Sequence, residues 1–163
     1  MRRLALTLFM AGLLGLISMG GMASSAAAQD LAFRGWGIRG GVSDDPDQVI
    51  VGAHANMGEF IPNLRFQPSL ELGFGDDHKT FTLTAPAFYR YPLNRTFTIY
   101  GGGGLVLGLD RNDEDNNDGT ELVISPELAG GFEWPAATGD AFVELGLLGG
   151  DLPNVRLMLG WTF

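Results

Sequence analysis

The sequence predicts an all-β protein that closes into an up-and-down antiparallel transmembrane barrel of about eight strands. Segments in which apolar and polar residues alternate recur along the chain, as strands with two different faces require. Turn residues separate these segments, and 25 of the 163 residues are glycine. Beyond the N-terminal segment, no stretch keeps apolar residues at spacings of three and four, the pattern of an amphipathic helix. These observations favour a barrel over a helical or mixed fold.

Eight alternating segments are predicted as strands, an even number that is typical of the smallest membrane barrels. The first, third, fifth and seventh connections between them are acidic, and the others are less so. An up-and-down barrel places these two sets at opposite ends, with the acidic loops outside and the other turns on the periplasmic side. The predicted strands span residues 34–42, 48–57, 64–75, 79–91, 96–109, 120–134, 140–149 and 154–163.

The first 28 residues have the features of a secretory signal peptide, which is removed on export. Two arginines precede an uncharged apolar run over 4–22, and small residues lead to a cleavage site after Ala28. The alternative is a membrane-spanning helix, because the run approaches the roughly 20 residues that a bilayer needs. The glycines in the run and the small residues after it favour cleavage. We therefore expect a signal peptide over 1–28 and a single barrel domain over 29–163.

Net charge and cysteine content exclude some partners and chemistries. The net charge of −9 becomes −11 when the two arginines of the signal segment are removed. Binding to nucleic acid needs clustered Lys and Arg, so nucleic acid is excluded as a partner. The chain contains no cysteine, which excludes a lipoprotein signal and a disulfide framework.

One face of the predicted strands carries arginine, glutamate and many glycines, with almost no lysine. In a membrane barrel this face lines a narrow interior, which small residues and paired charges must fill. Buried charges without partners are very costly, so we expect these arginines and glutamates to pair. A plug of salt bridges is expected in place of a wide pore, and a gated proton or ion path is the alternative. The predicted lumenal network is Arg39, Arg65, Arg90 and Arg156 with Glu71, Glu121, Glu127, Glu133 and Glu144.

Aromatic residues concentrate at the strand ends that would meet the periplasmic interface, where such rings mark the headgroup level. A soluble, lipocalin-like periplasmic binder has the same alternation with its faces exchanged, and it remains an alternative. The concentration of aromatic residues at one end, the scarcity of lysine and the density of glycine on the polar face favour the membrane barrel. The predicted girdle is Trp36, Tyr89, Tyr91, Trp134, Trp161 and Phe163, with Phe60, Phe66, Phe97, Phe132 and Phe142 expected near the same end.

The segment 155–163 alternates strictly and ends in an aromatic residue, Phe163. In this it resembles the closing strand of bacterial outer-membrane β-barrels, and nearly the whole mature length resembles the small OmpA/OmpX-type family. The resemblance implies a bacterial outer-membrane location, contact with lipid and lipopolysaccharide, and recognition of Phe163 by the barrel insertion machinery. It also implies a structural or surface-interaction role in the envelope, without the family's peptidoglycan-binding extension.

His54 and His78 are the basis of a competing function, a lipid A-modifying acyl-transfer enzyme. Outer-membrane deacylases and acyltransferases resemble this chain in size and barrel type, and they use His with Ser and an acid. No serine stands beside either histidine, so we expect no catalytic residues and no enzyme activity.

The acidic run 113–119 resembles a calcium loop through Asp113, Asp115 and Asn117. Its glycine falls one place late and no Glu occupies the closing position, so we expect a solvated loop. Weak binding of divalent cations is the alternative there, and no cofactor is expected. The four glycines of 101–104 are not a phosphate loop, because no helix follows and no Lys closes the motif.

Three prolines, Pro68, Pro86 and Pro126, fall inside predicted strands, and each removes one ladder donor. We expect bulges or bends at these positions, with inward-turned backbone or local widening. The sequence leaves open whether the strand register shifts by one residue at each of these prolines.

Overall fold

The computed structural model describes residues 30–44, 47–75, 78–112, 120–149, 152 and 155–163. The expected signal peptide and the run 113–119 lie outside these ranges. In the ranges given, no helix is long and apolar enough to cross a membrane. The strands are β1 (Asp30–Asp44), β2 (Gln48–Ile61), β3 (Leu64–Phe66), β4 (Ser69–Phe74), β5 (His78–Pro92), β6 (Thr98–Asn112), β7 (Thr120–Ala136), β8 (Gly139–Leu148) and β9 (Val155–Thr162).

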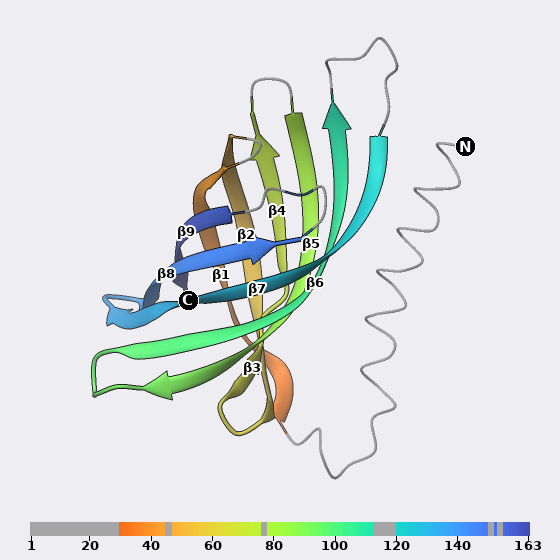
Figure 1. Ribbon diagram of the computed structural model, residues 1–163. Coiled ribbons are helices and arrows are strands. Elements are labelled where there is room, and N and C mark those ends of the chain that lie inside the picture. Colours follow the sequence, from red (N-terminus) through yellow and green to blue (C-terminus); the bar gives the residue numbers. More distant parts are fainter. Residues whose placement is uncertain (1–29, 45–46, 76–77, 113–119, 150–151, 153–154) are drawn as a thin grey trace.

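These strands form one closed antiparallel barrel (Figure 1). β1 pairs with β2 on one side and with β9 on the other, which joins the two ends of the sheet. The other strands pair with their neighbours in the chain. β3 and β4 act as one interrupted strand, because both lie between β2 and β5. The barrel therefore has eight strands, and the predicted closed up-and-down architecture is confirmed.

The prolines act differently from one another. The chain breaks between β3 and β4 at Pro68, whereas the β5–β6 and β6–β7 registers run without a shift through Pro86 and Pro126. The bulges expected at the latter two are therefore absent. In an antiparallel ladder the N–H and C=O of one residue face the same neighbour. The missing N–H of Pro86 thus faces the break between β3 and β4, and that of Pro126 faces the end of β8. Few ladder hydrogen bonds are lost at either place. The carbonyls stay bonded through Ala55 N to Pro68 O (2.9 Å), Gln67 N to Pro86 O (3.1 Å) and Gly149 N to Pro126 O (3.0 Å).

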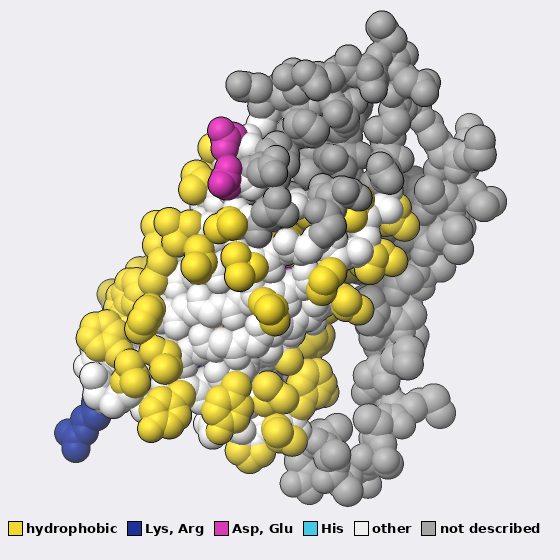
Figure 2. Space-filling view, in the orientation of Figure 1, with side chains coloured by type: hydrophobic (Ala, Val, Ile, Leu, Met, Phe, Trp, Pro, Cys, Tyr) yellow, Lys and Arg dark blue, Asp and Glu magenta, His cyan; other side chains and the backbone are white. Residues whose placement is uncertain are grey.

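The apolar face of each strand points outward and the charged face points inward. Ile124 and Leu159 are more than 60% exposed (63% and 61%), whereas Arg39 is only 4% exposed. In Figure 2 apolar side chains are spread over the outer wall among the backbone and uncharged side chains, and coloured charges appear only near its rims. Outward-facing apolar side chains from the strands around the barrel include Ile38, Val51, Leu72, Tyr89, Leu105, Ile124, Leu145 and Leu159.

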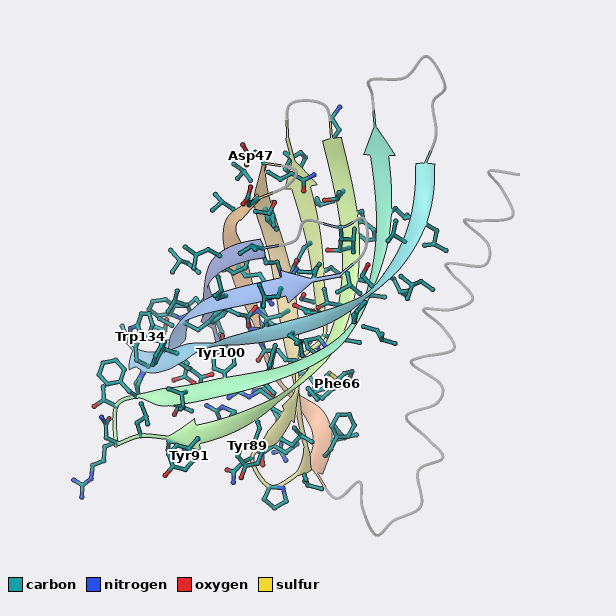
Figure 3. All side chains as sticks on the ribbon, in the orientation of Figure 1. Asp47, Phe66, Tyr89, Tyr91, Tyr100 and Trp134 are labelled. Carbon is teal, nitrogen blue, oxygen red and sulfur yellow. The ribbon has the colours of Figure 1, made fainter. Side chains whose placement is uncertain are left out.

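Aromatic side chains gather toward one end of the barrel. Figure 3 places Phe66, Tyr89, Tyr91 and Trp134 toward that end and Asp47 toward the other. Of the predicted girdle, four residues are about half exposed and two are partly exposed. The half-exposed residues are Trp36, Tyr89, Tyr91 and Phe163, and the partly exposed ones are Trp134 and Trp161. The ring centroids of Trp36 and Phe163 lie 4.9 Å apart.

Phe142 corrects this part of the prediction, because it lies inside the barrel and is only 3% exposed. It is two residues from Glu144 on β8, so the period of two places both on the inward face. Its aromatic side chain suggested a place at the membrane interface, but its position in the alternation of β8 places it on the inward face.

Large inward side chains lie over glycines of the neighbouring strand. Phe142 is paired with Gly160, where an added Cβ would come within 2.2 Å of the Phe142 ring. His54 is likewise paired with Gly37, and an added Cβ there would lie 2.4 Å from the imidazole. The glycines of the inward face thus provide the room in which a narrow barrel accommodates large side chains.

Candidate functional site in the barrel interior

The largest group of buried charges is an alternating chain of three glutamates and two arginines. Arg39 pairs with Glu144 and, through Nε, with Glu71 Oε1 at 3.3 Å. Arg156 pairs with the other oxygen of Glu71 at 2.6 Å and with Glu127. Their side chains are at most 3% exposed, so no part of this chain of ion pairs is open to solvent.

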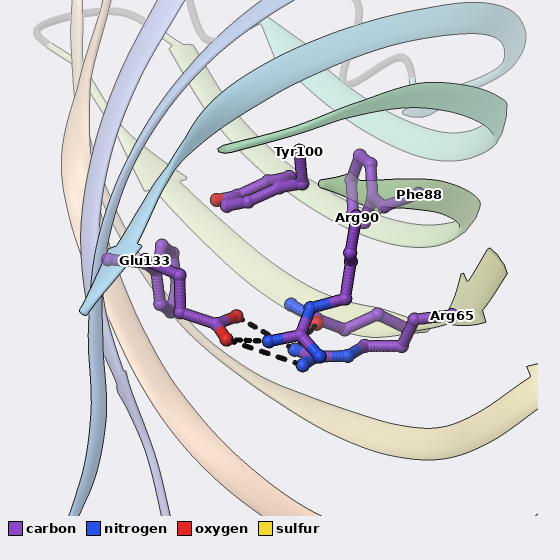
Figure 4. A pocket seen from close by; sticks show the side chains of 7 residues that line it. Arg65, Phe88, Arg90, Tyr100 and Glu133 are labelled. Carbon is purple, nitrogen blue, oxygen red and sulfur yellow. Dashed lines mark hydrogen bonds and ion pairs between the residues drawn. The ribbon is translucent and has the colours of Figure 1, made fainter. Parts of the chain in front are cut away.

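A second cluster lies nearer the aromatic end, where two arginines share one carboxylate (Figure 4). Arg65 Nη1 lies 3.0 Å from Glu133 Oε2, and Arg90 Nη2 pairs with Glu133 Oε1. Arg65 also donates to Gln67 Oε1 at 3.3 Å. The Arg90 side chain is 25% exposed, so this cluster, unlike the first, reaches the surface.

Aromatic groups lie between the two clusters. Tyr100 donates its hydroxyl to Glu144 Oε2 at 3.1 Å, and its ring meets Phe88 edge-on at 5.2 Å between centroids. Phe142 lies beneath the Arg39 guanidinium, 5.7 Å from its ring centroid, an arrangement that favours the cation. These contacts fix the orientation of the buried arginine in addition to its ion pairs.

The interior also contains an apolar layer at the opposite end from the aromatic side chains. Val106, Val123, Leu148 and Leu152 form this buried cluster. Leu152 lies between β8 and β9 and is 1% exposed. An added Cβ at Gly108 would lie 2.7 Å from Leu152, so this glycine makes room for the side chain.

Two small cavities lie in the described part of the interior. One cavity of about 10 Å³ lies between Arg65, Arg90 and Glu133, and another of about 10 Å³ lies beside Gln48 and Thr80. Each is large enough for about one water molecule.

The structure places most of the predicted network inside the barrel. The arginines of that network and four of its glutamates form the ion pairs above. The side chain of Glu121 lies outside the described part. Tyr100 and Phe142 were not predicted as members of the interior. Strand parity could have identified them, because Tyr100 is an even-numbered residue of β6 like the inward Val106, and Phe142 is two residues from the inward Glu144.

His54 is buried at 3% exposure, and its Nε2 lies 2.9 Å from Thr162 Oγ1. Ser69 is its partner across the β2–β4 ladder, but the Ser69 hydroxyl bonds Glu71 and Thr84, each at 2.8 Å. No described contact therefore links this histidine to a serine. The side chain of His78 lies outside the described residues.

In the ranges that the structure describes, no group of three or more His, Cys, Asp or Glu residues is arranged to hold a metal ion. The predicted weak cation ligands Asp113, Asp115 and Asn117 lie outside those ranges.

Comparison with solved structures places this architecture among known β-barrels. The N-terminal β-barrel domain of Pseudomonas aeruginosa OprF superposes with a TM-score of 0.64 at 13% identity, over 80% of this chain and 98% of that one. Neisserial surface protein A (NspA) matches with a TM-score of 0.57 at 18% identity, over 78% of this chain and 92% of that one. The chain has the fold of small eight-stranded outer-membrane barrels. Searches of protein-family models and of curated proteins each found no match.

Proposed function

We propose that this chain is a bacterial outer-membrane barrel with a structural or surface-interaction role in the envelope and a lumen closed by ion pairs. The observation that carries the proposal is the orientation of the two faces. Apolar side chains from strands all around the barrel face outward at about half exposure or more, and the arginine–glutamate chain is buried within. A soluble barrel needs the opposite arrangement.

The outer wall fits a lipid environment. Soluble monomers rarely expose contiguous apolar patches of more than a few hundred Å². Here the apolar surface follows the whole circumference, with aromatic residues toward one end and Asp47 toward the other (Figure 3). This arrangement supports outer-membrane lipid and lipopolysaccharide as partners, with the acidic connections at the outer surface.

The interior supports a closed lumen. Ion pairs, the aromatic groups between them and the apolar cluster occupy it, and two cavities in the described part are water-sized. The two competing functions receive less support. A binder of apolar ligands needs an apolar cavity. An acyl-transfer enzyme needs a histidine that lipid can reach, whereas His54 is buried at 3% exposure and the side chain of His78 lies outside the described residues.

Membrane fractionation tests the location. We expect the protein to sediment with the outer membrane, to require detergent for release, and to migrate compactly on a gel until it is boiled. Recovery in the soluble periplasmic fraction would contradict the proposal and favour the soluble binder.

Planar-bilayer recordings test the closed lumen separately. The purified protein is expected to give no sustained single-channel current, and steady conductance would favour the ion-path alternative. Mass analysis of lipid A with and without expression addresses the enzyme alternative, and an altered acyl pattern would support it.

A further inference from the structure

The cavity beside Arg65 and Arg90 has more hydrogen-bond donors than acceptors. Each guanidinium has five N–H donors. Their described acceptors are the two oxygens of Glu133 and the Oε1 of Gln67. The Nε of Arg90 is buried and has no hydrogen-bond partner. A buried unpaired donor is costly, so the cavity lacks an acceptor at this position.

The same cavity carries excess positive charge. Two guanidinium groups share the single carboxylate of Glu133, which leaves one positive charge uncompensated within the cluster. Asp140 on β8 also attracts Arg65, but no described ion pair joins the two residues. The cavity therefore favours an acceptor that carries negative charge.

The shape of the cavity limits how such a group enters. Rings of Phe88, Tyr100 and Phe142 line it, and so does Arg90, whose side chain is 25% exposed (Figure 4). Its volume of about 10 Å³ admits one oxygen atom, not a whole polyatomic anion. The remainder of the group must project past Arg90 toward the aromatic end of the barrel.

We propose that this cavity is an oxyanion site, which takes one oxygen of a carboxylate or a phosphate group against the Arg90 Nε and the Arg65 guanidinium. Both groups carry the same chemistry, a negatively charged oxygen that accepts charge-assisted hydrogen bonds. The site goes beyond the proposed function, because it depends only on residues of the interior and not on where the barrel resides.

Three substitutions give distinct expected results. Arg90→Gln removes the unpaired donor and the excess charge, and is expected to weaken anion binding about tenfold or more. Arg95→Gln is the matched control, because Arg95 is an exposed arginine of the β5–β6 turn outside the cavity, and binding is expected to be unchanged. Glu133→Gln frees both guanidinium groups from their resident carboxylate and is expected to tighten binding.

The experiment titrates the refolded protein in detergent micelles with sodium phosphate and, separately, with sodium acetate. Sodium chloride at matched ionic strength is the reference, and the arginine Nε–Hε NMR signals report binding. We expect a saturable shift of the Arg65 and Arg90 signals with at least one oxyanion and none with chloride, and the Arg65 signal gives the affinity of the Arg90 variants. The oxyanion that binds more tightly, phosphate or acetate, identifies which of the two chemical groups the site prefers.

Compact gel migration before boiling verifies that each variant is folded. If Arg90→Gln does not refold, Arg90→Lys replaces it, because lysine keeps the charge but lacks the Nε donor, and weaker binding is again expected. Three results would each overturn the proposal. They are the absence of a saturable shift, equal affinity of the parent and the Arg90 variant, and weaker binding by a folded Glu133→Gln.

Discussion

Glu71 and Glu127 hold different positions in the same chain of ion pairs. Glu71 pairs with two arginines and also accepts a hydrogen bond from Ser69, at 2.8 Å. Glu127 pairs with Arg156 alone, and its Oε2 is buried without a hydrogen-bond partner. Removing a residue that joins two buried charges leaves both of them undercompensated, whereas removing a terminal residue affects one.

We therefore expect Glu71→Gln to lower the free energy of unfolding by about 3–5 kcal/mol, and Glu127→Gln to lower it by less than about 2 kcal/mol. Urea unfolding of the barrel in lipid vesicles, followed by gel migration, measures both. The two substitutions are chemically identical at equally buried sites, so each is the control for the other. Equal losses would show that the position in the chain does not matter.

At the same scale, the sequence predicts membership of the charged interior but not its pairing. Arg39, Glu71 and Arg156 follow from strand parity, because every second residue faces inward. Their partners do not follow, since Arg39 and Glu144 are 105 residues apart and Arg156 and Glu127 are 29 apart. Which of them meet depends on the stagger of the strands around the barrel, which alternation does not encode.

Among the strands, Gly160 and Gly101 differ in the space that their backbones leave for a side chain. An added Cβ at Gly160 on β9 would lie 2.2 Å from the Phe142 ring. At Gly101 on β6 the nearest atom would be 3.9 Å away, an ordinary contact. Both glycines lie within strands and both are bonded to neighbours on two sides.

Gly160→Val is expected to displace Phe142 and to destabilise the barrel by about 1–3 kcal/mol, the usual cost of overpacking. Gly101→Val is expected to be neutral or slightly stabilising, because valine favours strands and the new side chain has room. The same unfolding assay compares the two variants. A neutral Gly160→Val would mean that Phe142 moves freely, and the tight packing described here would be wrong.

Most strand bounds were predictable within about three residues, because turn residues and loss of alternation mark them. The exceptions are the start of β1, at Asp30 and not at residue 34, and the end of β2, at Ile61 and not at residue 57. Glycine at the inward positions was also predictable as a way to fill a narrow interior, but the side chain that each glycine accommodates was not, because the residue opposite each glycine depends on the register. Pro86 and Pro126 show the same limit. A missing donor suggests a bulge when a strand is considered alone, yet both prolines face places where the neighbouring strand breaks or ends.

For the molecule as a whole, alternation shows that the barrel has two unlike faces but not which one is outside. Scarce lysine and dense glycine on the charged face indicated that this face is the interior, and the burial of Arg39 and Glu144 agrees with that assignment. The apolar layer around Leu152 had no such signal. This residue lies in a connection between strands, where alternation does not apply, so the sequence pattern does not predict its burial.

A membrane environment makes the cost of an outward charge depend on its depth, and two leucines of equal exposure test this. Leu145 on β8 is 52% exposed and Leu93 in the β5–β6 connection is 51% exposed. In water, arginine at either position would cost little, because both side chains already face solvent. In a bilayer, Leu145→Arg places the charge on the wall of the barrel and is expected to cost about 2–4 kcal/mol, whereas Leu93→Arg, at a turn, is expected to cost about 0–1 kcal/mol. Unfolding in lipid vesicles measures the difference. Equal, small effects of the two substitutions would indicate that the apolar wall is not embedded in lipid.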